Sequence, residues 1–122
     1  MFEPLDLGPD IGRLPNRVVM APMSTELGGK NGEVTDAMIA FYTERAKGGF
    51  GLIIVEYTCV DVATGRAHEY QLTLEGRDNL DGHKRLVKSV HDAGAKIFMQ
   101  MQHSGQYAVA KLLPDGMPVG PC

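Results

Sequence analysis

Three short apolar runs in the chain are separated by two segments whose apolar residues recur every three or four positions. The apolar runs occupy residues 17–21, 51–58 and 95–102, and the periodic segments occupy residues 35–47 and 79–93. Periodic recurrence is typical of an amphipathic helix, whereas a short uninterrupted apolar run is typical of a strand buried on both faces. The pattern therefore predicts strand, helix, strand, helix, strand, joined by two right-handed βαβ crossovers in a parallel sheet.

The first predicted helix has signals at both of its ends. Thr35 is a suitable N-cap because its hydroxyl can accept a hydrogen bond from a free backbone N–H of the first turn. The glycine pair at residues 48 and 49 ends the helix, since glycine adopts the left-handed conformation that a helix terminus needs. The buried face is predicted to be one stripe of side chains at helical spacing: Met38, Tyr42 and Ala46.

The second predicted helix follows a long loop at residues 59–77. Asp78 is its expected N-cap and Gly94 its expected end. Its buried stripe is predicted to consist of Leu80, Leu86, Val87 and Val90. The histidines of the loop and helix are interpreted as surface residues: His68, His83 and His91.

Turn-forming residues lie on both sides of the first predicted strand. Residues 1–14 contain two prolines and two glycines between isolated apolar positions, which predicts a short irregular or hairpin segment that caps the fold. Pro22 ends the strand because proline has no N–H to donate to a sheet. The chain then leaves the sheet and presents Ser24 and Thr25 beyond the carboxyl end of the strand.

Polar residues gather at the carboxyl end of every predicted strand: residues 24–25, 56–58 and 100–103. Ligands bind at this end in parallel α/β folds, so a shared polar rim is expected there. No Gly-x-Gly-x-x-Gly follows the first strand, which disfavours a dinucleotide-binding Rossmann fold. We therefore predict an α/β fold that is the N-terminal portion, about three βα units, of a (β/α)8 TIM barrel.

The chain has 122 residues, whereas a complete barrel needs about 200 or more. Three parallel strands also leave two open edges, which proteins normally pair or cover. We expect residues 1–122 to be one incomplete barrel domain, either a fragment or one piece of an assembly that supplies the remaining strands.

Composition excludes several classes of protein. The chain is 43% hydrophobic with a net charge of −3, which disfavours nucleic acid as a partner. The apolar run at residues 52–55 is too short to cross a membrane, and no signal peptide is visible. The two cysteines, Cys59 and Cys122, lie far apart and outside any metal-ligand spacing. We expect a reduced, cytoplasmic protein without a metal site.

Two glutamines are candidate ligand-binding residues. Gln100 and Gln102 share one face of the third predicted strand with Phe98, because side chains alternate along a strand. A glutamine amide offers both donors and an acceptor, which suits the edge of a planar ligand. For Gln100, ligand binding and a structural hydrogen bond are both open; for Gln102 the structural role is favoured.

Three further residues carry chemistry that can be structural or functional. His103 could polarise a substrate, although a hydrogen-bonded, partly buried histidine is the more common case. Glu56 follows four aliphatic residues, so its carboxylate needs a partner, which we expect to be Arg17 or a helix residue. Cys59 has no neighbouring base in the sequence to activate it.

Three sequence motifs resemble the Old Yellow Enzyme family in the same order and spacing. They are Asn16-Arg17-Val18-Val19-Met20-Ala21-Pro22-Met23-Ser24, Gly51-Leu52-Ile53-Ile54-Val55-Glu56, and Gln100-Met101-Gln102-His103-Ser104-Gly105. The segment at residues 42–49 is similar to the 2-enoate reductase and 2,4-dienoyl-CoA reductase branch. The resemblance implies a barrel that holds FMN, takes hydride from NADH or NADPH, and reduces the activated C=C bond of an enoate, enone or dienoyl substrate.

The resemblance also implies specific cofactor contacts. The backbone at Pro22 and Met23 would lie along the flavin ring, and the Ser24 hydroxyl would bond near its O4 and N5 atoms. Gln100 would bond the pyrimidine edge, and the backbone around Tyr57 would approach the same edge. Thr25 and His103 are the candidates for contact with the small-molecule substrate.

The chain departs from the family pattern at two positions and stops before others. Tyr57 stands where the family usually has a small residue, and Gln106 stands where it usually has arginine. In relatives the catalytic residues and the phosphate-binding loops come after the part that corresponds to residue 122. A 4Fe-4S cluster is expected only if a further domain follows. The alternative function is a non-catalytic, truncated barrel module that pairs with another chain or with itself. A flavin-free aldolase is disfavoured because no strand interior carries a lysine.

Overall fold

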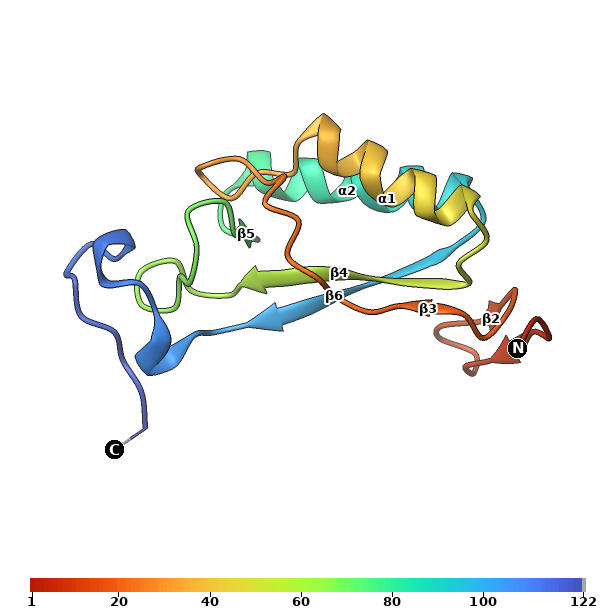
Figure 1. The fold of residues 1–122 in the computed structure, drawn as a ribbon, viewed down its shortest axis with the longest axis horizontal. Helices are drawn as coiled ribbons and strands as arrows, with labels where there is room; N and C mark the ends of the chain where they lie inside the picture. The colour runs from red at the N-terminus through yellow and green to blue at the C-terminus, as the bar shows by residue number, and fades with distance from the viewer. Residues whose placement is uncertain (122) are drawn as a thin grey trace.

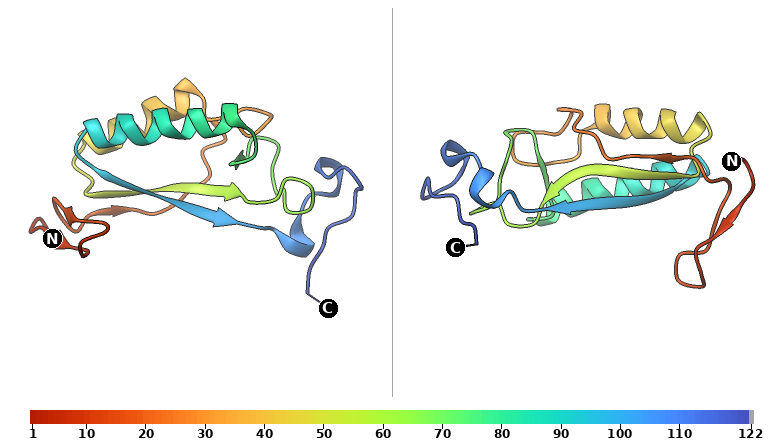
Figure 2. Two further views of the ribbon diagram at one scale, coloured as in Figure 1. Left: turned by 180° about the vertical axis from the view of Figure 1, so that it is seen from behind. Right: turned by 60° about the horizontal axis from the view of Figure 1, so that its bottom comes forward.

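Two helices lie side by side on one face of a parallel sheet in the computed structural model, which describes residues 1–121 (Figures 1 and 2). The helices are α1 (Asp36–Lys47) and α2 (Arg77–Asp92). The sheet consists of β3 (Val19–Met20), β4 (Leu52–Cys59), β5 (Leu72–Thr73) and β6 (Lys96–Gln102). The predicted alternation of strands and helices is confirmed, and with it the α/β class.

Strand β4 is the centre of the sheet. It pairs with β6 along one edge, and its other edge is shared by β3 near its start and β5 near its end. Pro22 explains the sharing, because the chain leaves the sheet there and frees the far half of that edge for β5. The prediction of a strandless loop at residues 59–77 was therefore wrong. Within residues 1–121 the sheet does not close into a barrel, and the outer edge of β6 has no strand partner.

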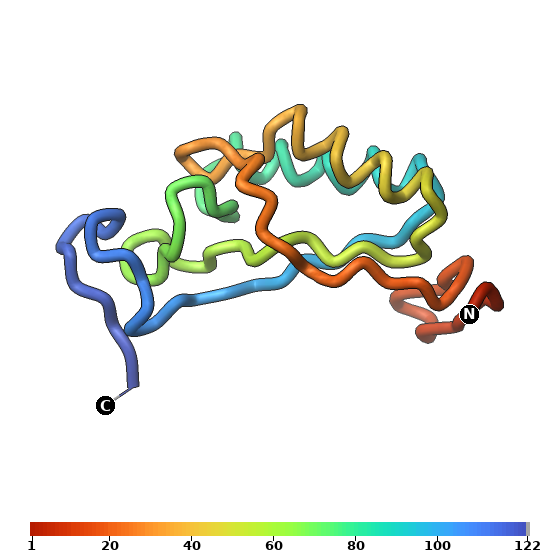
Figure 3. Tube along the Cα trace, in the orientation of Figure 1, coloured from red at the N-terminus to blue at the C-terminus, as the bar shows by residue number. Residues whose placement is uncertain are grey.

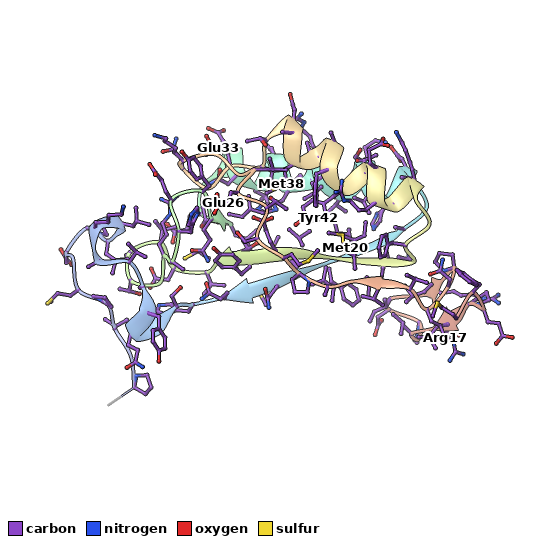
Figure 4. All side chains as sticks on the ribbon, viewed as in Figure 1. Arg17, Met20, Glu26, Glu33, Met38 and Tyr42 are labelled. Carbon is purple, nitrogen blue, oxygen red and sulfur yellow. The ribbon has the colours of Figure 1, made fainter. Side chains whose placement is uncertain are left out.

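The core lies between α1, α2 and the helix-covered face of the sheet. Figure 4 shows Met38 and Tyr42 pointing from α1 toward the sheet, where Met20 meets them. The predicted stripe of α1 is confirmed, since Met38, Tyr42 and Ala46 are all buried. The predicted N-cap is confirmed as well, because the Thr35 hydroxyl accepts a hydrogen bond of 3.2 Å from the Met38 N–H.

Helix α2 corrects three predictions. Its N-cap is Gly76 and no side chain caps it, so Asp78 lies in the first turn instead. Leu80 and Val87 are 45% and 38% exposed, and His83 is buried. The buried face consists of Gly82, His83, Leu86 and Val90.

The rotation of α2 follows from a close contact at Gly82. A Cβ on Gly82 would lie 3.1 Å from the Val34 Cβ, so a larger residue would push Val34 or the helix away by a few tenths of an ångström. The approach turns His83 inward, where its Nε2 lies 3.1 Å from the Thr73 carbonyl oxygen of β5. Leu80 and Val87 are turned to the outer flank. The end of the helix was predicted correctly: Gly94 has a φ of 91°.

Short segments cover the two ends of the sheet. At the amino end β1 (Leu5–Asp6) pairs with β2 (Arg13–Leu14) in an antiparallel hairpin, one of the two alternatives predicted for residues 1–14. At the carboxyl end the 3-10 helices η1 (Gly105–Tyr107) and η2 (Ala110–Leu112) run beside the loop after β4, as the chain trace in Figure 3 shows. Backbone hydrogen bonds join the two segments, from Ser104 to Gly65 and from Val109 to Arg66. No helix in residues 1–121 is long and apolar enough to cross a bilayer. Cys122, the second cysteine, lies outside the described residues.

Candidate functional site

A β-bulge in β4 brings two of the predicted cofactor residues opposite each other. Strands β4 and β6 stay in step as far as the pair Val55 and Met99, but the next pair is Thr58 and Met101. Between these pairs β4 contains Glu56 and Tyr57, whereas β6 contains only Gln100. Bulges redirect side chains and are frequent beside active sites. Tyr57 and Gln100 are thus cross-strand neighbours at the carboxyl half of the sheet.

Residues 22–26, which we call the Ser24 loop, are anchored to the same bulge. The Thr25 N–H donates a hydrogen bond of 2.9 Å to Glu56 Oε2. The Thr25 hydroxyl makes a local hydrogen bond, in which it accepts from the Leu27 N–H at 3.2 Å. Met23 and Ser24 are exposed. The hydroxyl of Ser24 has no hydrogen-bond partner within residues 1–121.

Glu56 is held by the helix layer as well as by the loop. Its side chain is only 1% exposed, and the Tyr42 hydroxyl donates to its Oε2 atom at 3.2 Å. The same hydroxyl accepts from the Glu56 N–H at 3.1 Å. Burial raises the pKa of Tyr42, so the hydroxyl keeps the proton that it donates.

The expected pairing of Glu56 with a helix residue is therefore confirmed, while Arg17 was the wrong candidate. Arg17 lies beside the N-terminal hairpin (Figure 4), where its N–H bonds to the Met1 carbonyl. The sequence analysis identified Tyr42 only as an apolar member of the α1 stripe. Its hydroxyl was the missed signal, because a buried tyrosine normally finds a hydrogen-bond partner.

The two glutamines of β6 have different surroundings. Gln102 Oε1 accepts from Gln71 Nε2 at 2.7 Å, and Gln102 Nε2 donates to Ser104 Oγ at 2.9 Å. Gln102 thus has the structural role that was favoured for it. Gln100 is exposed, and its amide makes no hydrogen bond within residues 1–121. Its donors and acceptor are free for a ligand.

His103 links two loops at the carboxyl end. Its Nδ1 accepts from the Gly105 N–H at 3.0 Å, so the ring proton is on Nε2. Nε2 then donates to the Thr64 hydroxyl at 2.9 Å, and Thr64 donates to Asp61 at 2.6 Å. The bond from Thr64 lowers the pKa of Asp61. The ring is exposed and not partly buried, and both of its nitrogens are used within the chain.

Cys59 has the surroundings of a packed thiol. It is buried, its Sγ donates to the Asp61 carbonyl at 3.1 Å, and burial raises the pKa of the thiol. Such a group is a poor nucleophile at neutral pH. Across residues 1–121 no three His, Cys, Asp or Glu side chains gather in a way that could hold a metal ion.

The free polar groups near the bulge match one class of ligand. The Ser24 hydroxyl and the Met23 N–H are unpaired donors in the described chain, and the Gln100 amide supplies donors together with an acceptor. A planar ring with carbonyl oxygens and an N–H along one edge complements this set. The isoalloxazine edge of FMN has such groups, so these residues fit the cofactor that the sequence resemblance implies.

Comparison with known proteins gives consistent matches along the chain. The model of the NADH:flavin oxidoreductase / NADH oxidase family matches residues 1–122. The NADH oxidase of Thermoanaerobacter brockii is 41% identical over 106 residues, which are 87% of this chain and 16% of that protein.

Two solved structures show the same arrangement of elements. Morphinone reductase matches with a TM-score of 0.84 and 32% identity over 95% of this chain and 29% of its own. The old yellow enzyme homologue from Zymomonas mobilis matches with a TM-score of 0.84 and 28% identity over 95% of this chain and 31% of its own. The chain therefore spans less than a third of each of these proteins.

Proposed function

Because the chain belongs to the NADH:flavin oxidoreductase / NADH oxidase family, we propose that its strand ends form one wall of the FMN site of an NAD(P)H-dependent oxidoreductase. The comparisons bear out the resemblance to the N-terminal part of Old Yellow Enzymes. Because the chain spans only 16% to 31% of the relatives named above, the activity is proposed for a complete barrel. Residues 1–122 are proposed to be an incomplete domain of that barrel.

The residues of the Ser24 loop and the bulge have separate roles in this proposal. The backbone at Pro22 and Met23 would hold the ring, and the Ser24 hydroxyl would donate a hydrogen bond to its edge. Gln100 and the backbone of Tyr57 would hold the pyrimidine edge. These groups would bind and orient the ring.

The reaction proposed for the complete barrel is the reduction of an activated alkene. When bound, FMN supplies hydride transfer from NADH or NADPH to an enoate, enone or dienoyl substrate. Thr25 and His103 are proposed for the substrate side. Since their polar side-chain atoms are already hydrogen-bonded within the chain, we assign them to shaping the rim.

One observation carries the proposal: the bulge gathers the predicted flavin contacts. The pairing of β4 with β6 sets Tyr57 opposite Gln100, and the hydrogen bond from Thr25 to Glu56 ties the Ser24 loop to the same place. Contacts that are 76 positions apart in sequence, at Ser24 and Gln100, thus belong to one rim. Both side chains are exposed, so their polar groups are available to a ligand.

Complementation tests this function. The 122-residue chain is coexpressed with the Thermoanaerobacter brockii NADH oxidase from which the matching segment has been deleted. We expect a yellow complex that oxidises NADH or NADPH in the presence of 2-cyclohexen-1-one. Ser24→Ala and Gln100→Ala should each weaken FMN binding about tenfold, the size of one or two hydrogen bonds. Gln106→Ala, an exposed glutamine of η1, is the matched control. Unchanged FMN affinity in both site variants would contradict the proposal.

The unpaired outer edge of β6 in residues 1–121 supports a second function, a non-catalytic module that pairs with another chain or with itself. Light scattering combined with flavin absorbance separates the two functions. A stable oligomer that takes up no FMN, alone or in the complementation experiment, would favour the module.

A further inference from the structure

The Ser24 loop has one main-chain anchor. Among residues 1–121, the only hydrogen bond from a backbone N–H or C=O of residues 22–26 to another element is the one from Thr25 to Glu56. The side chain of Glu26 also faces His68 at 3.5 Å, but the Glu26 side chain is 67% exposed. Solvent-exposed ion pairs of this kind contribute little stabilising free energy. The position of the loop therefore depends on the buried carboxylate.

The backbone of the loop is also strained. Glu26 has a φ of 58°, and it is the one residue other than glycine with a positive φ in the described chain. A glutamate in this conformation persists only where its surroundings enforce it. The bond at the preceding residue, Thr25, is the nearest restraint from the sheet. Without it the loop would be free to relax away from β4.

The carboxylate of Glu56 is itself held in a fixed orientation. Tyr42 is fully buried in the α1 stripe, and its hydroxyl bonds both to the backbone N–H and to the side chain of Glu56. The carboxylate therefore cannot rotate without losing a buried hydrogen bond. A rigid path runs from α1 through Tyr42 and Glu56 to Thr25.

We propose that Glu56 is a positioning residue for the flavin wall. By accepting the Thr25 N–H, it sets the Ser24 hydroxyl at a defined place beside the bulge of β4, where Tyr57 lies opposite Gln100 of β6. The cofactor side of this inference rests on the proposed function. The loop side rests on the hydrogen bonds alone.

Amide hydrogen exchange of the 15N-labelled full chain tests the loop side. Glu56→Ala should speed exchange at Thr25 about tenfold or more, because the N–H loses a charged acceptor. Glu56→Gln should keep exchange within about threefold, since its amide oxygen can occupy the place of Oε2. The amide of Val90, in the core of α2, reports whether the fold is intact. The inference would be overturned if Thr25 exchanged as slowly in Glu56→Ala as in the unsubstituted chain. It would also be overturned if Thr25 exchanged as fast in Glu56→Gln as in Glu56→Ala.

Loss of protection at Val90 in Glu56→Ala would mean that this variant does not keep the fold. In that case a second variant, Tyr42→Phe, tests the inference. Tyr42→Phe keeps the carboxylate but removes the group that orients it. Thr25 should then exchange at least about threefold faster in Tyr42→Phe than in Glu56→Gln. Equal exchange rates in these two variants would overturn the positioning role.

Flavin affinity in the complementation experiment tests the cofactor side. Glu56→Ala should weaken FMN binding about tenfold and Glu56→Gln should leave it unchanged. If the unsubstituted complex takes up no FMN, the proposed function fails while the exchange result at Thr25 still stands or falls by itself. If FMN binds equally well to the unsubstituted complex and to Glu56→Ala, the positioning role fails while the proposed function stands.

Discussion

Replacing Gln102 by leucine should destabilise the fold, although leucine is the more hydrophobic side chain. Gln71 is only 2% exposed, and its Nε2 donates to Gln102 Oε1. Leucine cannot accept this hydrogen bond. The substitution also removes Gln102 Nε2, which donates to Ser104 Oγ. Leaving a buried polar group without a partner costs about 1–3 kcal/mol. The added apolar contact of a half-buried leucine offsets only a fraction of this cost.

Urea unfolding followed by circular dichroism measures the effect. The slope of the unfolding free energy with urea is about 1–2 kcal/mol per molar for a domain of this size. The midpoint of Gln102→Leu should therefore fall by about 1 M. The double variant Gln71→Leu with Gln102→Leu should not recover the loss, because Gln71 Oε1 also accepts from the Ala67 N–H at 2.8 Å and that donor then has no acceptor.

Gln100→Leu is the matched control on the same strand. Its amide makes no hydrogen bond within residues 1–121, so the same substitution should change the unfolding free energy by less than about 0.5 kcal/mol. The effects on FMN affinity should be the reverse: Gln100→Leu should weaken FMN binding more than Gln102→Leu does. Equal stability of Gln102→Leu and Gln100→Leu would refute the assignment of separate roles to the two glutamines.

Three further predictions concern the cofactor, pH and helix capping. The isolated chain should bind FMN weakly or not at all, because the resemblance places the phosphate-binding loops in the later part of the barrel; stoichiometric quenching of flavin fluorescence would contradict this. Burial lowers the pKa of His83 below its ordinary 6.5, so the folded chain binds fewer protons than the unfolded chain. Stability should fall as the pH drops below about 6.5, and urea midpoints at pH 5 and 7.5 should differ less in His83→Gln. Thr35→Ala should cost about 1 kcal/mol by loss of the α1 cap, whereas Asp78→Ala, in the uncapped first turn of α2, should change the urea midpoint little.

Signals between near neighbours in sequence were sufficient for the order of the elements. The periodic stripe at residues 38, 42 and 46 predicts α1, and the Thr35 cap depends on an N–H only three residues away. The same is true of Gly94, which ends α2 because of its own backbone conformation. Such features follow from the sequence because both partners of each interaction lie within a turn of one another.

The phase of α2 and the strand β5 were not predictable in this way. Leu80 and Val87 are seven residues apart and Leu86 and Val90 are four, so both pairs have helical spacing. The contact of Gly82 with Val34 decides which pair is buried. Strand β5 is two residues long and carries no strong pattern. It forms because Pro22 vacates half of an edge of β4, an event some 50 residues earlier in the chain.

The candidate site divides along the same line. From the residues alone, polar side chains were expected at the end of each strand, with Ser24, Tyr57 and Gln100 as candidates for one rim. That Glu56 bonds to Tyr42 and Thr25, and that the bulge sets Tyr57 opposite Gln100, became visible only in the folded chain. These partners are far apart in the sequence. A buried carboxylate requires some partner, but which partner it meets depends on how separate elements pack.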